Sequence, residues 1–194
     1  MHAVCVYCGS SSGDDAAFAN ATRALGTELA RRAITLVYGG GSVGLMDVCA
    51  NAALSAGGRV VGVIPELLLQ REVAHLDLSE LHVVQTMHQR KKLMADFADG
   101  FIALPGGIGT LEELFEAWTW NQLGYHNKPL GLLNVEGYFD PLLAFLASSM
   151  RRGFVRAEVL ARLQVDTDPA RLLQRMTTGQ TLAADPWWQM RDEI

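Results

Sequence analysis

The residues most able to do chemistry lie in residues 101–113, which read FIALPGGIGTLEE. An apolar run is followed by a glycine-rich turn and then by the start of a predicted helix. Gly106, Gly107 and Gly109 carry no side chain that would keep an anion away from the backbone amides. The first turn of the helix adds unpaired N–H groups and the positive end of its dipole. The stretch therefore predicts a phosphate-binding loop, although it matches neither the dinucleotide fingerprint nor the P-loop motif.

The same stretch also has a purely structural interpretation. Residues 110–113 fit a capping box, in which Thr110 is the N-cap and the Glu113 side chain returns to its amide. Glycines after a strand are common in ordinary turns as well. The two interpretations give Glu113 different roles, chemical in one and structural in the other.

Composition limits the classes of function. The chain has 194 residues, 49% of them hydrophobic, which suits one domain with a substantial core. Its net charge of −5 argues against binding to nucleic acid, which needs a basic face. With no signal peptide and no apolar run of membrane-spanning length in view, we expect a cytoplasmic protein without a membrane partner. Cys5 and Cys8 have C-x-x-C spacing but lack the helix of redox motifs, so buried small residues are favoured over a redox or metal site.

Strand-like and helix-like segments alternate along the chain. Because the strand-like runs are continuously apolar, they predict a parallel sheet covered by helices on both faces. We expect an α/β fold, a doubly wound sheet of about six to seven strands, in a single domain spanning residues 1–194 with a peripheral tail from about residue 180. The expected strands are residues 4–7, 34–38, 59–64, 81–85, 101–104 and 129–134, with a short one near 163–165. Residues 66–80 lack clean periodicity and are a candidate lid or substrate loop.

Four unusual clusters follow predicted strands, where doubly wound folds bind their ligands. They are residues 9–11 (GSS), 39–42 (GGGS), 87–91 (MHQRK) and 105–110 (PGGIGT). Arg90 stands in the first turns of a predicted helix, where a cation opposes the helix dipole. It is either a solvated surface charge or a guanidinium group that binds a phosphate or a leaving group through paired N–H donors.

Two adjacent carboxylates, Glu112 and Glu113, are the remaining candidates for a chemical role. On a helix Glu112 and Glu113 point about 100 degrees apart, so they cannot do the same work. A carboxylate can stabilise the oxocarbenium-like state through which a glycosidic bond breaks. From the residues alone, we expect a phosphorylated sugar or nucleotide substrate and acid/base or electrostatic catalysis.

These motifs resemble those of the LOG ("lonely guy") family, the cytokinin riboside 5′-monophosphate phosphoribohydrolases, which are often mislabelled lysine decarboxylases. Besides PGGIGTLEE and MHQRK, the shared segments are YCGSS at 7–11, YGGG at 38–41, VGLM at 43–46, GVIP at 62–65 and GLLN at 131–134. The resemblance implies a Rossmann-like homodimer, with its active site near the interface, that cleaves the N-glycosidic bond of cytokinin riboside 5′-monophosphates and of AMP. The products would be the free base and ribose 5-phosphate, and no metal or redox cofactor is expected.

The resemblance also implies roles for particular residues. Arg90 and Glu113 correspond to the catalytic pair, and Glu72 resembles the glutamate that recognises the base. The further substrate-binding residues are Lys91, Gly106, Gly107, Ile108, Gly109, Thr110, Leu111 and Glu112, with Gly9, Ser10, Gly40, Gly41 and Thr119 as additional lining. Asp47 stands where many relatives carry glycine, which could alter contacts near the second glycine loop.

Other functions stay open at this point. A non-catalytic carrier of a nucleotide or of the molybdenum cofactor would need the phosphate loop but not the pair Arg90 and Glu113. Lysine decarboxylation is disfavoured, because no motif predicts a pyridoxal-type site and a lysine substrate needs no anion site. The helix bearing Trp118, Trp120 and Leu123 is expected to pack either against a partner subunit or into the core.

Overall fold

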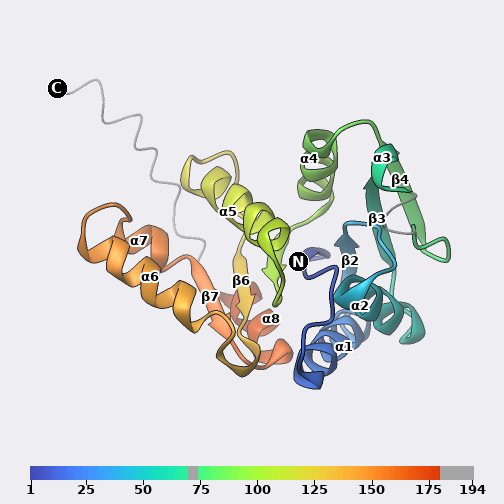
Figure 1. The fold of residues 1–194 in the computed structure, drawn as a ribbon, viewed down its shortest axis with the longest axis horizontal. Helices are drawn as coiled ribbons and strands as arrows, with labels where there is room; N and C mark the ends of the chain where they lie inside the picture. The colour runs from blue at the N-terminus through green and yellow to red at the C-terminus, as the bar shows by residue number, and fades with distance from the viewer. Residues whose placement is uncertain (70–73, 180–194) are drawn as a thin grey trace.

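The computed structural model describes residues 1–69 and 74–179, and Figure 1 shows their arrangement. Glu72 and the tail expected from about residue 180 lie outside these residues. Within them, seven strands form one parallel sheet in the order β4-β3-β2-β1-β5-β6-β7, which confirms the predicted α/β fold. The strands are β1 (Ala3–Tyr7), β2 (Thr35–Tyr38), β3 (Val60–Pro65), β4 (Glu80–Val84), β5 (Gly100–Ala103), β6 (Leu130–Leu133) and β7 (Leu163–Asp166).

Helices cover both faces of the sheet (Figure 1). One core cluster lies between the sheet and α1, α2 and α8, and a second lies between the sheet and α4, α5, α6 and α7. The helices are α1 (Ala16–Arg31), α2 (Gly44–Ser55), α3 (Glu66–Leu69), α4 (Met87–Phe97), α5 (Ile108–Gln122), η1 (Val135–Gly137), α6 (Asp140–Arg151), α7 (Ala157–Leu160) and α8 (Pro169–Thr178). In the part of the chain that is described, no helix combines the length and the apolar character needed to cross a membrane.

The central strand β1 shows why the strands are continuously apolar. Val4 and Val6 belong to the first cluster, whereas Cys5 and Tyr7 belong to the second, and all four are at most 4% exposed. Side chains alternate between the two faces of a strand, and here each face is covered by helices. Every position of β1 from Val4 to Tyr7 is therefore a core position.

The order of the strands reverses beside β1. This strand pairs with β2 on one side and with β5 on the other, so the chain continues outward in opposite directions from it. The loops that follow β1 and β5 meet at this point, where the Gly9 amide donates a hydrogen bond to the Pro105 carbonyl (3.1 Å). Such a reversal opens a crevice at the carboxyl ends of the strands, where ligands bind in this class of fold.

The interface hypothesis is wrong for Trp118. This side chain is 5% exposed, lies in the second core cluster, and donates its indole N–H to the Val159 carbonyl (3.2 Å). Trp120 is half-buried against the same cluster. The α5 helix therefore uses this face to cover the sheet, which was the alternative expectation.

Candidate functional site

A cavity of about 310 Å³ lies at the carboxyl ends of β1 and β2 and at the start of α5. Its walls come from segments far apart in the sequence. The lining residues are Val6, Cys8, Ser10, Gly39, Met46, Leu68, Met87, Arg90, Gly107, Ile108, Gly109, Thr110, Glu112 and Glu113. A second cavity of about 250 Å³ adjoins it and shares Ser10 and Gly107.

The structure brings most of the expected site residues together. Those that line the first cavity are Ser10, Arg90, Gly107, Ile108, Gly109, Thr110, Glu112 and Glu113, and Gly9 and Gly106 line the second. Lys91, Leu111, Gly40, Gly41 and Thr119 line neither cavity, and Glu72 lies outside the described residues. Gly39 and Met87 also line the first cavity and belong to the clusters 39–42 and 87–91 that were predicted there, whereas the lining residues Val6, Cys8, Met46 and Leu68 were not predicted. The apolar ones among them look like core residues in the sequence, so no pattern separates them from the rest of the core.

Arg90 is buried, so its interpretation as a solvated surface charge is wrong. Its side chain donates to the Gly39 carbonyl through Nη2 (2.7 Å) and to the Val63 carbonyl through Nε (3.1 Å). A Cβ atom on Gly39 would lie 2.1 Å from Nη2, so the guanidinium needs glycine at this position. Backbone carbonyls directly after β2 and within β3 thus hold the cation at the cavity.

The start of α4 sets the position of Arg90. Thr86 is the N-cap, and its hydroxyl accepts a hydrogen bond from the Gln89 amide (3.1 Å) while Gln89 Oε1 accepts one from the Thr86 amide (3.2 Å). This is a capping box, which fixes where a helix begins. The sequence TMHQ at residues 86–89 carries the signature of a capping box, but this cap was not predicted.

The capping box predicted for α5 is wrong. This helix begins at Ile108, its N-cap is Gly107, and within the described chain no side chain caps it. Thr110 is instead the third residue of the helix and is 4% exposed. The first amides of a helix have no intrahelical partner, and a glycine N-cap supplies no side chain to satisfy them. The amides at the start of α5 are therefore available to an anion.

The glycines of this loop are needed for two different reasons. A Cβ atom on Gly106 would lie 2.2 Å from Thr110 Oγ1 and 2.8 Å from the Gly9 amide nitrogen, so close packing requires glycine there. A Cβ atom on Gly107 or Gly109 would meet no atom of the described residues within 4 Å. At these two positions glycine leaves open space in the cavity, which is the property expected of an anion site.

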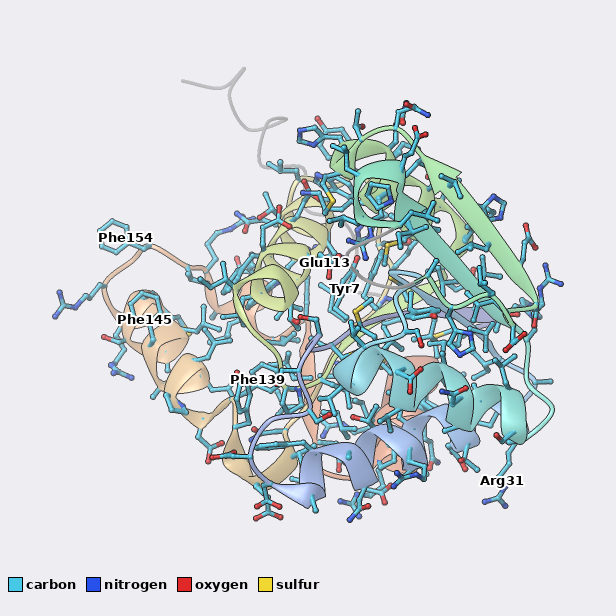
Figure 2. All side chains as sticks on the ribbon, turned by 45° about the vertical axis from the view of Figure 1, so that its right-hand side comes forward. Tyr7, Arg31, Glu113, Phe139, Phe145 and Phe154 are labelled. Atoms are coloured by element: carbon cyan, nitrogen blue, oxygen red, sulfur yellow. The ribbon has the colours of Figure 1, made fainter. Side chains whose placement is uncertain are left out.

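Glu113 is half-buried and lies beside the end of β1, as Figure 2 shows for Glu113 and Tyr7. Burial raises the pKa of Tyr7 and of Cys8, and the Glu113 carboxylate is among the charges that raise both further. Burial alone raises the pKa of Cys49 to about 12. The thiols of Cys8 and Cys49 are therefore neutral. Cys5 is buried as well, which confirms the prediction that Cys5 and Cys8 are buried residues. Residues 1–69 and 74–179 contain no cluster of three metal-binding side chains.

Lys91 joins the helices that carry Arg90 and Glu113. Its Nζ contacts Glu112 Oε1 (2.5 Å) and Glu116 Oε1 (3.0 Å). Burial opposes the charge of Lys91, but the hydrogen bonds and charges of the two glutamates outweigh it and raise the pKa. The ammonium group thus stays charged and connects α4 to α5. Glu116 was not predicted, because nothing in the sequence indicates which glutamates face α4.

The loop after β2 contacts residues on two other segments of the chain. Gly40 accepts a hydrogen bond from the His75 amide (3.1 Å), and Gly41 forms an isolated antiparallel bridge with Ala74. The Ser42 hydroxyl donates to Asp47 Oδ1 (2.8 Å). Asp47, which stands where many relatives carry glycine, therefore contacts the second glycine loop. This loop therefore holds Ala74 and His75 in place.

Two alanine substitutions separate the roles of the loop glycines. Gly106→Ala should lower the melting temperature by about 3–10 °C, because overpacking costs about 1–3 kcal/mol. Gly107→Ala should change it by no more than about 1 °C, since φ is −86° and the methyl group enters open space. Thermal unfolding followed by circular dichroism compares the two variants, and equal losses would contradict this division of roles.

Solved structures share the fold at low sequence identity. A molybdenum cofactor carrier protein from Chlamydomonas reinhardtii aligns with a TM-score of 0.68 and 20% identity, covering 90% of this chain and 97% of the other. A molybdenum cofactor binding protein from Rippkaea orientalis aligns with a TM-score of 0.67 and 21% identity, covering 91% and 95%. These likenesses support the Rossmann-like fold and nothing narrower.

Sequence relatives are much closer. The family model described as "Possible lysine decarboxylase" matches residues 46–176. The probable cytokinin riboside 5′-monophosphate phosphoribohydrolase LOGL1 of Oryza sativa is 46% identical over 97% of this chain and 86% of its own length. LOG of the same species is 51% identical over 88% of this chain and 70% of its own, and LOG1 of Arabidopsis thaliana is 53% identical over 78% and 71%. At this identity and coverage, and with Arg90 and Glu113 lining one cavity, the chain belongs to the LOG family of cytokinin riboside 5′-monophosphate phosphoribohydrolases.

Proposed function

We propose that this protein hydrolyses the N-glycosidic bond of cytokinin riboside 5′-monophosphates, and of AMP, to the free base and ribose 5-phosphate. The observation that carries the proposal is the placement of Arg90 and Glu113 in one cavity with the uncapped N-terminus of α5. Relatives that are 46% to 53% identical are named for this activity. We further propose that the protein acts as a homodimer in the cytoplasm.

The phosphate group binds at the start of α5 in this proposal. Amides of Gly107, Gly109 and Thr110 donate to its oxygens, and the positive end of the helix dipole favours the negative charge. Open space in front of Gly107 and Gly109 admits the group. Glu112 contacts the substrate nearby, Lys91 acts on the substrate through its ion pair with Glu112, and Glu72 recognises the base.

The chemical step uses Glu113 and Arg90. As the bond between C1′ and the base nitrogen breaks, positive charge develops on the ribose, and the Glu113 carboxylate stabilises it. A water molecule oriented by Glu113 forms the new C–O bond at C1′, and the base leaves with the bonding electron pair and takes up a proton. Arg90, fixed by the Gly39 and Val63 carbonyls, holds Glu113 or the departing base in position. Water is the only co-reactant that this reaction requires.

Incubation with AMP and with N6-isopentenyladenosine 5′-monophosphate tests the proposal. We expect equal amounts of free base and ribose 5-phosphate, measured by chromatography and by a sugar-phosphate assay. The ratio of the two kcat/KM values reports the preferred base. Saturable binding of either nucleotide without release of base would instead indicate a carrier.

Glu113→Gln should lower kcat by about 10²- to 10⁴-fold, the range typical of a side chain that moves protons or charge in the transition state. KM should change by no more than about threefold, because the lost charge acts mainly in the transition state. The matched control is Glu158→Gln, an exposed glutamate on α7 outside both cavities. Unaltered turnover in Glu113→Gln would leave this glutamate with a structural role.

The homodimer is supported by apolar side chains at the rim of the cavity. Ile108 lines the cavity and is 88% exposed, and Leu67, next to the lining residue Leu68, is 83% exposed. Large exposed apolar side chains that gather in one place often mark an interface. Light scattering at micromolar concentration should give twice the chain mass of 21.1 kDa, and Ile108→Glu should reduce it. A monomeric wild-type protein would contradict the proposal.

A further inference from the structure

Tyr138 contacts the phosphate loop from a distant part of the chain. Its hydroxyl donates a hydrogen bond of 2.6 Å to the carbonyl of Gly106, 32 residues earlier. The tyrosine lines the second cavity together with Gly106 and Gly107, but it does not line the cavity that contains Arg90 and Glu113. It therefore contacts the loop from the second cavity rather than from the cavity of the proposed reaction.

The turn after β6 places Tyr138 with little freedom. Asn134 is buried, its Oδ1 accepts from the Phe139 amide (2.8 Å), and its Nδ2 donates to Asp140 Oδ1 (2.7 Å). Gly137 has φ of +69°, which allows the sharp turn between these contacts. This gives a physical reason for the GLLN segment at residues 131–134, whose asparagine had no function assigned.

Two neighbouring rings hold the Tyr138 ring. Its centroid lies 5.8 Å from that of Phe18 and 5.0 Å from that of Phe139, both in edge-to-face geometry. Edge-to-face pairs of this kind favour one ring orientation. The hydroxyl is thus directed at the loop even though the residue as a whole is 41% exposed.

A hydrogen bond to the Gly106 carbonyl orients the next amide as well. In a planar trans peptide the C=O of one residue and the N–H of the next point in opposite directions, and the described residues contain no cis peptide. Because the carbonyl points to Tyr138, the Gly107 N–H points away from it. This peptide unit joins two glycines, which could otherwise adopt many orientations.

We propose that Tyr138 is a positioning residue that orients the Gly106–Gly107 peptide so that the Gly107 amide donates to the phosphate group of the nucleotide. The proposal rests on the proposed function for the identity of the ligand. Two further contacts hold the same loop: the Gly9 amide donates to Pro105, and Thr110 packs against Gly106. Tyr138 adds the contact that selects the direction of one amide, and it acts on binding of phosphate rather than on the bond that breaks.

Tyr138→Phe removes the hydroxyl and keeps the ring contacts. AMP binding is measured by calorimetry in the Glu113→Gln protein with and without Tyr138→Phe, so that the ligand is not consumed. The hydroxyl's loss should weaken AMP binding by about threefold to tenfold, the effect of one typical hydrogen bond. Binding of adenosine, which lacks the phosphate, should stay within twofold. In the otherwise wild-type enzyme, KM for AMP should rise by a similar factor while kcat stays within twofold.

The matched control is Tyr125→Phe, which removes an equivalent hydroxyl from a tyrosine that is 79% exposed and lines neither cavity of the site. Unchanged AMP affinity in Tyr138→Phe would overturn the proposal, and so would equal weakening of AMP and adenosine, which indicates a general structural role. If the wild-type enzyme releases no base from AMP, the proposed function fails, whereas the binding comparison still decides the role of Tyr138.

Discussion

The site depends on the burial of one positive charge. Taking a guanidinium out of water is costly unless hydrogen bonds compensate it, and for Arg90 the Gly39 and Val63 carbonyls provide two of them. Gly39 directly follows β2 and Val63 lies within β3, so the sheet itself positions the cation. The same contact excludes a side chain at Gly39 and requires α4 to begin at Met87.

A second constraint concerns backbone amides rather than side chains. A helix that is capped by its own side chains is more stable, but its amides are then occupied. The α4 helix has a full capping box, whereas the N-cap of α5 is a glycine, and in the described structure no side chain caps this helix. The two helices therefore differ as the proposed roles require: a fixed α4 holds Arg90, and an α5 with open first amides would bind the phosphate. Lys91 then joins them through Glu112 and Glu116.

The fold alone does not distinguish an enzyme from a carrier. A carrier protein and a binding protein for the molybdenum cofactor share this architecture at 20% and 21% identity, which is too low to transfer a function. A carrier and a hydrolase both need amides that bind phosphate. The difference lies in a cation and a carboxylate at the same cavity, because charges placed beside the sugar would serve a transition state that a carrier never forms.

Much of the fold and part of the site could be predicted from local sequence patterns. Continuous apolar runs such as that of β1 predicted a parallel sheet, and glycine clusters after strands predicted the place of the cavity that Gly39, Gly107 and Gly109 line, because both follow from the chemistry of neighbouring residues. The start of α5 was predicted wrongly: Thr110 satisfies the capping pattern, but the helix begins two residues before it, at Ile108, and Thr110 packs against Gly106 instead, a contact that the sequence does not show.

Contacts between distant segments were decided only by the tertiary structure. Arg90 could have been a solvated charge, and nothing within its own helix shows that its side chain donates to the Gly39 and Val63 carbonyls. Trp118 could have faced a partner, yet the sheet beneath α5 buries it. Tyr138 reaches Gly106 across 32 residues through a turn that Asn134 holds. Local sequence determines which elements form and which chemistry they carry, whereas side-chain partners depend on which elements the sheet brings side by side.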